Sequence, residues 1–454
     1  MSTLLVNRRF ALLLAGRAAS NVGDWTFSTA VTIWITVGIA RGQAWAPLAV
    51  AGVSVVIAVP TLVVGPLAGV FVDRWDRRRT MLRVDALRAA LAAALIVFSL
   101  AGAGLPDLVR VAGVYAVVGL ATVCSTFFTP AQVALVGDLV PPEERVRASS
   151  LVQLAVSGGQ VVGPTLGAAL YFAWGVQWAM AVDAASFLAS YAVIRAIAAR
   201  PEAAAPAATA AGPGAVAGEL AGGLAFVARD RTLRALLLSL LLANAGASSV
   251  AVLGIFFLQE NLHAAPSWYG AMGSVGAAAS LAGAAAGAVL SRRLARPWLF
   301  PASVIAMGCV MLVYARLTAI GPALALVFLL GLCRVAILVA IMPILLAVTP
   351  DGLLGRVSAT INPALSIGVL AATPLAGALA AGLRGLDAHP LGVHVGRIDA
   401  IYAGAGLLVT AAGLLALLSM RVPVTPPARP DGRAQPPPPG SEPAASRTGA
   451  ERAS

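Results

Sequence analysis

The strongest constraint on this sequence is a recurrence of apolar runs of about 20 residues, because each run is long enough to cross the hydrocarbon core of a membrane. With 59% apolar and 11% charged residues, the chain carries more apolar surface than a soluble globule can cover. The pattern predicts an all-α integral membrane protein with twelve transmembrane helices. We place them at 10–40, 46–71, 81–102, 109–135, 148–172, 174–197, 234–258, 267–291, 298–318, 322–347, 357–382 and 398–420.

The basic residues predict how the chain is oriented. All 31 are Arg, and 19 of them lie at one set of the expected helix ends. The opposite ends carry Arg41, Arg110, Arg316, Arg384 and Arg397. Because positive residues accumulate on the cytoplasmic side, both termini are predicted to be cytoplasmic in a plasma (inner) membrane. The net charge of +12 therefore reflects topology, and we expect no nucleic-acid partner.

The residue inventory excludes several kinds of chemistry. Without Lys, the chain has neither a Walker A phosphate loop nor the amine of a pyridoxal Schiff base. Cys124, Cys309 and Cys333 lie in apolar runs without metal-ligand spacing, and the three His residues lie in expected loops. No nucleophile, base and orienting group fall together at useful spacing. We expect no metal, no cofactor and no enzymatic activity.

Two polar segments divide the chain. Residues 200–232 join an Ala/Pro/Gly-rich stretch to a short interfacial helix, and residues 422–454 hold too much Pro and too many polar residues to form a core. The predicted domains are an N-terminal six-helix bundle at 1–199, a cytoplasmic linker at 200–232, a C-terminal six-helix bundle at 233–421 and a disordered cytoplasmic tail at 422–454.

Two segments of the first half recur in the second half in the same order. GPLAGVFVDRWDRRR, from Gly65, is repeated by GAAAGAVLSRRLAR, from Gly283, with two Gly and one Arg at one shared offset. The segment from Arg147 is repeated less strictly by the segment from Arg356. Ordered repeats of this kind predict two pseudo-symmetric halves of six helices each.

At these motifs the sequence resembles the major facilitator superfamily, over nearly the whole chain to about residue 421. Its signature in the loop after the second span is matched by Gly65, Gly69, Asp73, Arg74, Arg77 and Arg78. The fifth-span signature of its proton-coupled drug exporters is matched by Gly159, Gly163, Pro164 and Gly167, with Ala168 in place of a last Gly. Segments that start at Arg17, Val140 and Glu219 resemble the macrolide-efflux and enterobactin-exporter branch.

The resemblance implies roles for both signatures. Asp73 and its neighbouring Arg residues would close the cytoplasmic side against span eleven. Alternatively, any single Arg there could only help to set the orientation of the chain in the membrane. The Gly residues of span five would let helices slide or, alternatively, only pack closely. The sequence departs from the family twice: span four lacks the Arg of many proton antiporters, and Ser291 stands where a repeat of Asp73 would fall.

Charged residues inside the spans carry the most functional information, because each costs roughly 3 kcal/mol at the bilayer centre. Asp24 lies near the middle of span one and Arg334 near the middle of span ten, both of which line the central cavity in the superfamily. Asp24 is the proton-coupling candidate; its alternative is an inert ion pair with Arg17 or Arg334. The cavity and substrate candidates are Arg17, Asn21, Trp25, Asn244 and Arg334.

Three further charges lie inside expected spans. Asp85 and Arg88 are three residues apart in span three, so we expect them to pair with each other, and Asp183 lies in span six. The function expected from the whole pattern is export of small amphipathic, drug-like molecules by alternating access with proton antiport, by a monomer in the lipid bilayer. The alternatives are a dedicated siderophore or secondary-metabolite exporter and, from a different class, a non-transporting receptor or scaffold.

Overall fold

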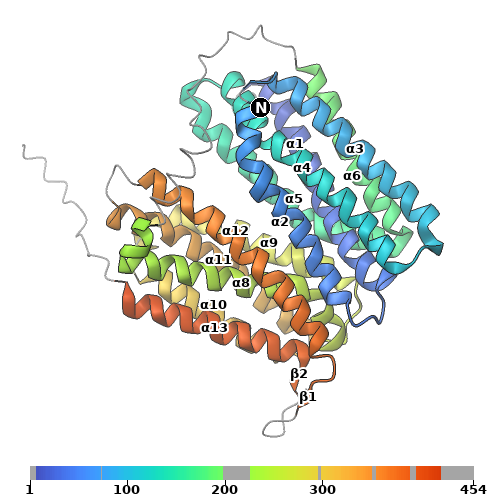
Figure 1. Cartoon of the computed structure of the whole chain (residues 1–454). Coiled ribbons are helices and arrows are strands. Elements are labelled where there is room, and N and C mark those ends of the chain that lie inside the picture. Colours follow the sequence, from blue (N-terminus) through green and yellow to red (C-terminus); the bar gives the residue numbers. More distant parts are fainter. Residues whose placement is uncertain are drawn as a thin grey trace, which may run out of the picture. The chain divides into compact units, whose positions relative to one another are not determined.

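The computed structural model describes residues 7–72, 74–197, 225–294, 298–349, 354–388 and 395–420, and these are almost entirely helical (Figure 1). The first half contains α1 (Arg8–Ile33), the π-helix η1 (Trp34–Ile39), α2 (Ala46–Val72), α3 (Arg77–Ala101), the 3-10 turn η2 (Gly102–Gly104), α4 (Asp107–Leu139), the 3-10 turn η3 (Pro142–Glu144), α5 (Arg145–Trp174) and α6 (Val176–Ala196).

The second half contains α8 (Arg231–Glu260), α9 (Trp268–Leu294), α10 (Leu299–Tyr314), α11 (Ile320–Val348), α12 (Leu354–Gly382) and α13 (Arg397–Ser419). Two short antiparallel strands, β1 (Asp387–Ala388) and β2 (Val395–Gly396), lie between α12 and α13. Of the predicted linker only its end is described, where residues 225–229 are helical; the predicted tail lies outside the described residues.

Polar residues set the starts of several helices, as local physical chemistry requires. The side chains of Asn7, Asp76 and Asp230 accept hydrogen bonds from backbone N–H groups of the first turns of α1, α3 and α8, at 2.7–2.8 Å. Gly175, with φ of +97°, joins α5 to α6 in a conformation that favours glycine. Polar residues or a glycine thus mark the boundaries of these helices.

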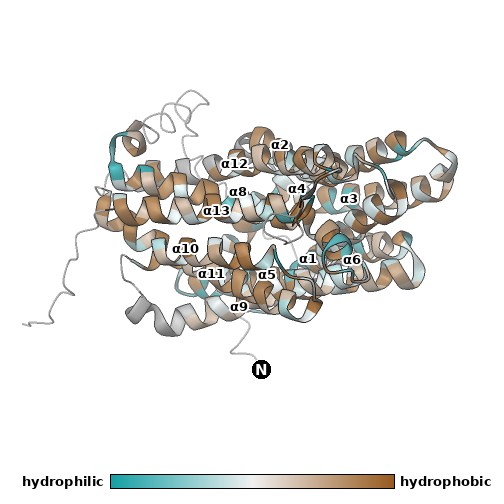
Figure 2. Cartoon of the chain, turned by 90° about the horizontal axis from the view of Figure 1, so that it is seen from below, coloured by the Kyte–Doolittle hydropathy of each residue, from teal (hydrophilic) through white to brown (hydrophobic). Residues whose placement is uncertain are grey.

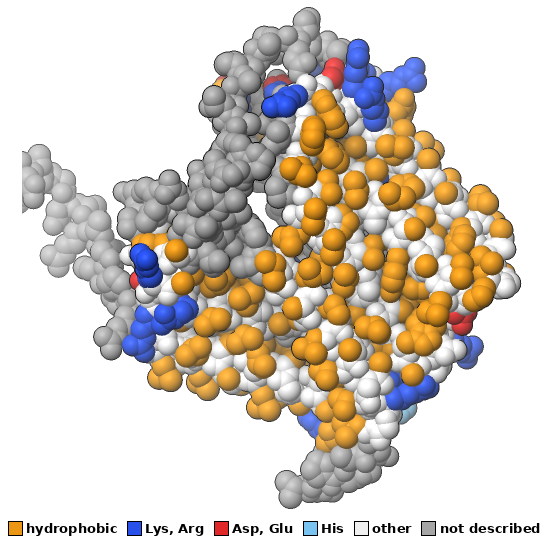
Figure 3. All heavy atoms as spheres, viewed as in Figure 1, with side chains coloured by type: hydrophobic (Ala, Val, Ile, Leu, Met, Phe, Trp, Pro, Cys, Tyr) orange, Lys and Arg blue, Asp and Glu red, His pale blue; other side chains and the backbone are white. Residues whose placement is uncertain are grey.

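Eight of the described helices are long and apolar enough to cross a membrane: α2, α3, α4, α6, α8, α11, α12 and α13. Figure 2 shows the apolar character of the helices, and Figure 3 shows a face covered by hydrophobic side chains with Arg gathered near helix ends. Among the other helices, α1 contains Arg8, Arg9, Arg17 and Asp24, and α10 has only 16 residues. The helices α5 and α9 are rich in Gly and Ala, which contribute little hydropathy.

The helices pack in the same plan in both halves. In the first half, α1 packs against α5 and α6, α3 against α4 and α6, and α2 against α4. In the second half, α8 packs against α12 and α13, α10 against α11 and α13, and α9 against α11. The second set repeats the first, helix by helix in chain order, which gives the repeated sequence segments a structural counterpart.

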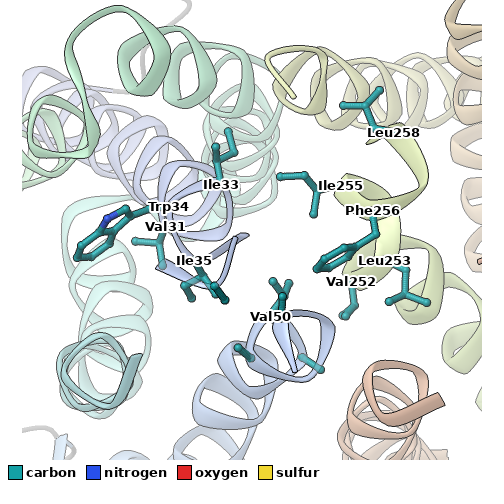
Figure 4. Packing of buried hydrophobic residues seen from close by; sticks show 14 of the residues in the cluster. Val31, Ile33, Trp34, Ile35, Val50, Val252, Leu253, Ile255, Phe256 and Leu258 are labelled. Atoms are coloured by element: carbon teal, nitrogen blue, oxygen red, sulfur yellow. The ribbon is translucent and has the colours of Figure 1, made fainter. Parts of the chain in front are cut away.

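The two halves share one hydrophobic core near one end of their helices. That cluster joins Val31, Ile33 and Val50 of the first half to Ile255 and Phe256 of the second, as Figure 4 shows. The remaining clusters each belong to one half. Contacts between the halves come mainly from α5 with α9 and from α2 with α12. The halves are therefore held together at the end where α1 finishes and α2 begins.

Candidate functional site

A central cavity of about 380 Å³ lies between the halves, with walls from α1 and α5 on one side and α8, α9, α10 and α11 on the other. Its apolar wall includes the side chains Trp25, Tyr269, Met272, Met307, Met311 and Tyr314. Its polar wall includes Ser28, Thr29, Thr32, Gln160 and Ser280. A volume of several hundred Å³ with mostly apolar walls and a few polar groups is typical of small-molecule sites.

Arg334 is the one charged residue among the described residues that line this cavity. It lies in the middle of α11 and is exposed, as is Trp25 from the opposite wall. Sequence reasoning named both as cavity candidates, and the structure places both on the cavity surface. Asn21 and Asn244 do not lie among its lining residues. Asn21 is buried where α1 meets α5, and its side-chain amide donates to the carbonyl of Arg17 at 2.9 Å.

Asp24 lines a second cavity, of about 270 Å³, inside the first half. The expectation that it faces the central cavity together with Arg334 therefore needs correction: Asp24 points from α1 toward α3 and α6, whereas Trp25, the next residue, lines the central cavity. Consecutive residues of a helix point in directions about 100° apart, which accounts for the difference. Ser28 contributes to the walls of both cavities, so the two lie next to each other.

The partner of Asp24 is Arg88, at 2.5 Å between Oδ1 and a terminal guanidinium nitrogen. This overturns two expectations, that Asp24 pairs with Arg17 or Arg334 and that Arg88 pairs with Asp85. The guanidinium carbon of Arg88 also lies 4.0 Å from the centre of the Phe187 ring on α6. A guanidinium that contacts both an aromatic face and a carboxylate is favourably placed for a buried cation.

Three more charged side chains complete a cluster between α1, α3 and α6. Arg17 lies within electrostatic reach of Asp24 and Asp85, and Asp183 within reach of Asp24 and Arg88. Asp85 and Asp183 are buried, and Oδ1 of Asp183 has no hydrogen-bond partner among the described residues. Three carboxylates thus share two guanidinium groups. With every group ionised, the cluster would hold one negative charge in excess, which burial makes costly.

The span-five signature lies where α5 touches α1. A Cβ added at Gly159, Gly163 or Gly167 would approach atoms of α1 to 2.7, 2.4 and 2.3 Å. The hydroxyl of Thr26 donates to the carbonyl of Gly163 at 3.3 Å. The three Gly residues are spaced by four and therefore form one face, along which two backbones can approach closely. Within the first half, this geometry favours close packing over sliding.

Pro164 faces the opposite direction, toward the second half. It lines the central cavity, and a Cβ added at Gly270 of α9 would lie 2.3 Å from its carbonyl oxygen. One residue later, the hydroxyl groups of Thr165 and Ser274 are hydrogen-bonded at 2.7 Å. The signature thus combines a tight contact inside one half with a contact between the halves.

The loop signature begins in the last turns of α2. Gly65 and Gly69 have open space where a Cβ would be, so neither is required here for close packing. Arg74 is exposed. Asp73 lies outside the described residues, and its predicted gating contact is not part of the described structure.

Arg77 and Arg78 contact their own half. Arg77 pairs with Asp138 near the end of α4, at 2.5 Å. Arg78 donates to the carbonyls of Ile194 and Arg195 at the end of α6, at 3.1 and 2.6 Å. Cations are favourable at helix C-termini, where carbonyl groups lack partners. Both residues therefore attach α3 to α4 and α6, a structural role that the signature alone did not reveal.

The sequence reasoning missed two features of the site. Arg88 was assigned to Asp85 because local spacing is the only pairing that a sequence displays, and Asp183 received no role. The signal that could have drawn attention to Asp183 is its place in an apolar run, since ionisable residues in spans are expensive and tend to be functional.

Comparison with known proteins agrees with this arrangement. The family model described as Major Facilitator Superfamily matches residues 13–372. The chain belongs to the major facilitator superfamily. It is therefore a multi-pass membrane transporter, of a superfamily whose members are generally not enzymes and act on small molecules.

Individual relatives match this chain at low sequence identity. An uncharacterised transporter of this superfamily from Bacillus subtilis, YkuC, is 25% identical over 89% of this chain and 90% of its own length. Macrolide efflux protein A of Streptococcus pyogenes is 27% identical over 38% of this chain, and the match spans 41% of that protein. The inward-facing crystal structure of a bacterial homologue of the iron transporter ferroportin covers 91% of this chain with a TM-score of 0.69 and 17% identity, which shows a shared fold.

Proposed function

We propose that this chain exports small amphipathic compounds by alternating access, driven by inward proton flow. The observation that carries the proposal is the central cavity, which both halves line with mostly apolar side chains and which lies beside a buried cluster of ionisable groups. The similarity of this chain to macrolide efflux protein A supports transport out of the cell.

The proposed architecture has twelve spans in two six-helix bundles, at 1–199 and 233–421, joined by a cytoplasmic linker at 200–232 and followed by a cytoplasmic tail at 422–454. The repeated packing plan of α1–α6 and α8–α13 supports this arrangement. The excess of Arg at one set of helix ends supports cytoplasmic termini in the plasma (inner) membrane. Nothing in the proposed transport cycle requires a second copy, so we propose a monomer.

With that topology, the shared core near Ile33 and Phe256 lies on the extracellular side, and we infer an inward-open state from it. Alternating access then requires contacts such as Thr165 with Ser274 to break while contacts form on the cytoplasmic side. Asp73, at the cytoplasmic end of α2, is the proposed closing residue, with Arg74 beside it.

Asp24 is the proposed proton carrier. Of the three clustered carboxylates it is the one with substantial exposure, at 31% of its side chain, and it lines a cavity, so water can reach it. In the state described, its carboxylate contacts the guanidinium group of Arg88. Protonation would break this pair and leave Arg88 to the buried Asp183 or Asp85, which links proton binding to a change in how α1, α3 and α6 contact one another.

A transport experiment tests the function as a whole. The chain is expressed in a bacterial strain that lacks its own efflux pumps, and the accumulation of chemically varied fluorescent amphipaths is measured with and without a protonophore. We expect lower accumulation of at least one compound, and loss of this effect with the protonophore. Unchanged accumulation across the panel would contradict the proposal.

The proton carrier is tested with substitutions in the same assay. Asp24→Asn should abolish protonophore-sensitive export while the protein remains in the membrane. Asp107→Asn, which alters a partly exposed i,i+3 pair at the start of α4, is the matched control and should export normally. Export by Asp24→Asn at the wild-type rate would rule out its coupling role, and loss of coupling only in Asp183→Asn would transfer the role to α6.

A further inference from the structure

The distribution of charge between the two cavities is uneven in a way that bears on the ligand. The acids Asp24 and Asp183 line the cavity inside the first half, where Arg88 accompanies them. The central cavity has no acidic residue among its described lining residues, and its charged residue is Arg334. A ligand in the central cavity therefore meets a positive charge with no carboxylate beside it.

Arg334 has no structural explanation within the described part of the chain. No carboxylate is paired with it there, and its side chain is exposed in the cavity. An Arg in the middle of a membrane helix is energetically costly, so an unpaired one needs water or a ligand to solvate it. Arg88, by contrast, is paired with the carboxylate of Asp24 and packs against the ring of Phe187.

The rest of the wall suits an apolar body. Met272, Met307 and Met311 are flexible, polarisable side chains that adapt to varied shapes, and Trp25 and Tyr269 offer flat faces. Guanidinium groups bind carboxylate and sulfonate oxygens through two parallel hydrogen bonds. A cationic head group has no anionic oxygens to accept these bonds. The wall thus combines one anion-binding group with a broad apolar surface.

We propose that the central cavity selects anionic amphipaths, that is, an apolar ring system with a carboxylate, sulfonate or phosphate group, and disfavours cations. The proposal rests on the proposed function only for calling this cavity the transport site; the binding preference itself follows from the lining residues. It makes Arg334 the residue that determines specificity for charge.

The test is a binding measurement on the purified full chain in neutral detergent. The probes are 8-anilinonaphthalene-1-sulfonate and N-phenyl-1-naphthylamine, which has the same ring system without the sulfonate. Fluorescence above that of protein-free micelles reports binding. We expect the sulfonate to bind the wild type at least tenfold more tightly, because a hydrogen-bonded ion pair adds at least this much. Tetraphenylborate should displace it, and tetraphenylphosphonium, nearly the same shape with opposite charge, should not.

Substitutions assign the effect to one residue. Arg334→Gln should weaken binding of the sulfonate about tenfold and leave the neutral amine unchanged, which also shows that the variant is folded. Arg334→Lys should retain most of the affinity. The control is Arg231→Gln, which removes one positive charge from an exposed position at the start of α8, outside the cavity lining, and should change neither affinity.

Equal binding of the two probes by the wild type would overturn the proposal, as would sulfonate binding that Arg334→Gln does not weaken or displacement by tetraphenylphosphonium. Competition by phosphatidylglycerol would identify a membrane lipid as the anion source and competition by 2-naphthoate a soluble compound; either result supports the charge preference. Failure of the proposed function looks different, because charge-selective binding would persist without any export.

Discussion

Replacing Arg88 by Gln is the sharpest perturbation of the buried charge cluster. The Arg88 guanidinium pairs with Asp24 at 2.5 Å and faces the ring of Phe187 at 4.0 Å, and 9% of its side chain is exposed. Removing one partner of a buried ion pair costs about 3–5 kcal/mol, because the remaining charge stays buried without compensation. We expect Arg88→Gln to lower the free energy of unfolding by about this amount.

The composition of the cluster predicts that removing Arg88 costs more stability than removing Asp24. Arg88→Gln leaves three carboxylates to Arg17 alone, whereas Asp24→Asn leaves two carboxylates, Asp85 and Asp183, with two guanidinium groups. Removal of the acid therefore relieves an excess of negative charge and should cost less than removal of the base. When Asp24→Asn and Arg88→Gln are combined, two carboxylates share one guanidinium, whereas Arg88→Gln alone leaves three with one. The double variant should therefore lose less stability than Arg88→Gln alone.

Thermal unfolding of the purified protein in detergent, followed by size-exclusion chromatography of the fraction that stays folded, ranks the variants. The control is Arg79→Gln, which removes a base from an exposed pair with Asp76 at 3.7 Å. Exposed pairs contribute about 0–1 kcal/mol, so this variant should unfold close to the wild-type temperature.

The reasoning would be refuted if Asp24→Asn unfolded at a lower temperature than Arg88→Gln, or if Arg88→Gln behaved like the exposed control. Either result would mean that the cluster does not carry an excess of carboxylates over guanidinium groups in the folded protein.

Two further predictions concern α5. Gly167→Ala should destabilise the protein by about 1–3 kcal/mol in the same assay, because its Cβ would lie 2.3 Å from the carbonyl oxygen of Thr26, whereas Gly158→Ala, with no atom within 4 Å of its Cβ, should not. Thr165→Val removes the hydroxyl hydrogen bond to Ser274 between the halves, worth about 0.5–1.5 kcal/mol, and leaves the longer bond from the backbone N–H to the same hydroxyl, at 3.3 Å. Spin-label distances between α5 and α9 at that end should therefore show a larger open population, and an unchanged distribution would contradict this.

Much of the fold could be predicted from sequence, for a definite physical reason. Backbone groups in a membrane must be satisfied within their own segment, so an apolar run of sufficient length predicts a helix almost independently of its neighbours. The predicted apolar segments fall on the helices α1–α6 and α8–α13, with η1 continuing α1, and eight of these helices are long and apolar enough to cross a membrane. The repeated motifs anticipated the repeated packing plan. The placement of Trp25 and Arg334 on the central cavity also agreed with expectation.

The partners of the charged residues were decided by tertiary structure alone. Sequence spacing assigned Arg88 to Asp85, three residues away, but the acid that it meets is 64 positions distant on α1. Which neighbour a side chain reaches depends on how α1, α3 and α6 are rotated against one another. Close approaches such as Gly23 of α1 against Ser186 of α6 fix that rotation. The sequence by itself thus determined that these helices exist and that their charges must be buried, whereas only packing decided which charges meet and which cavity each one faces.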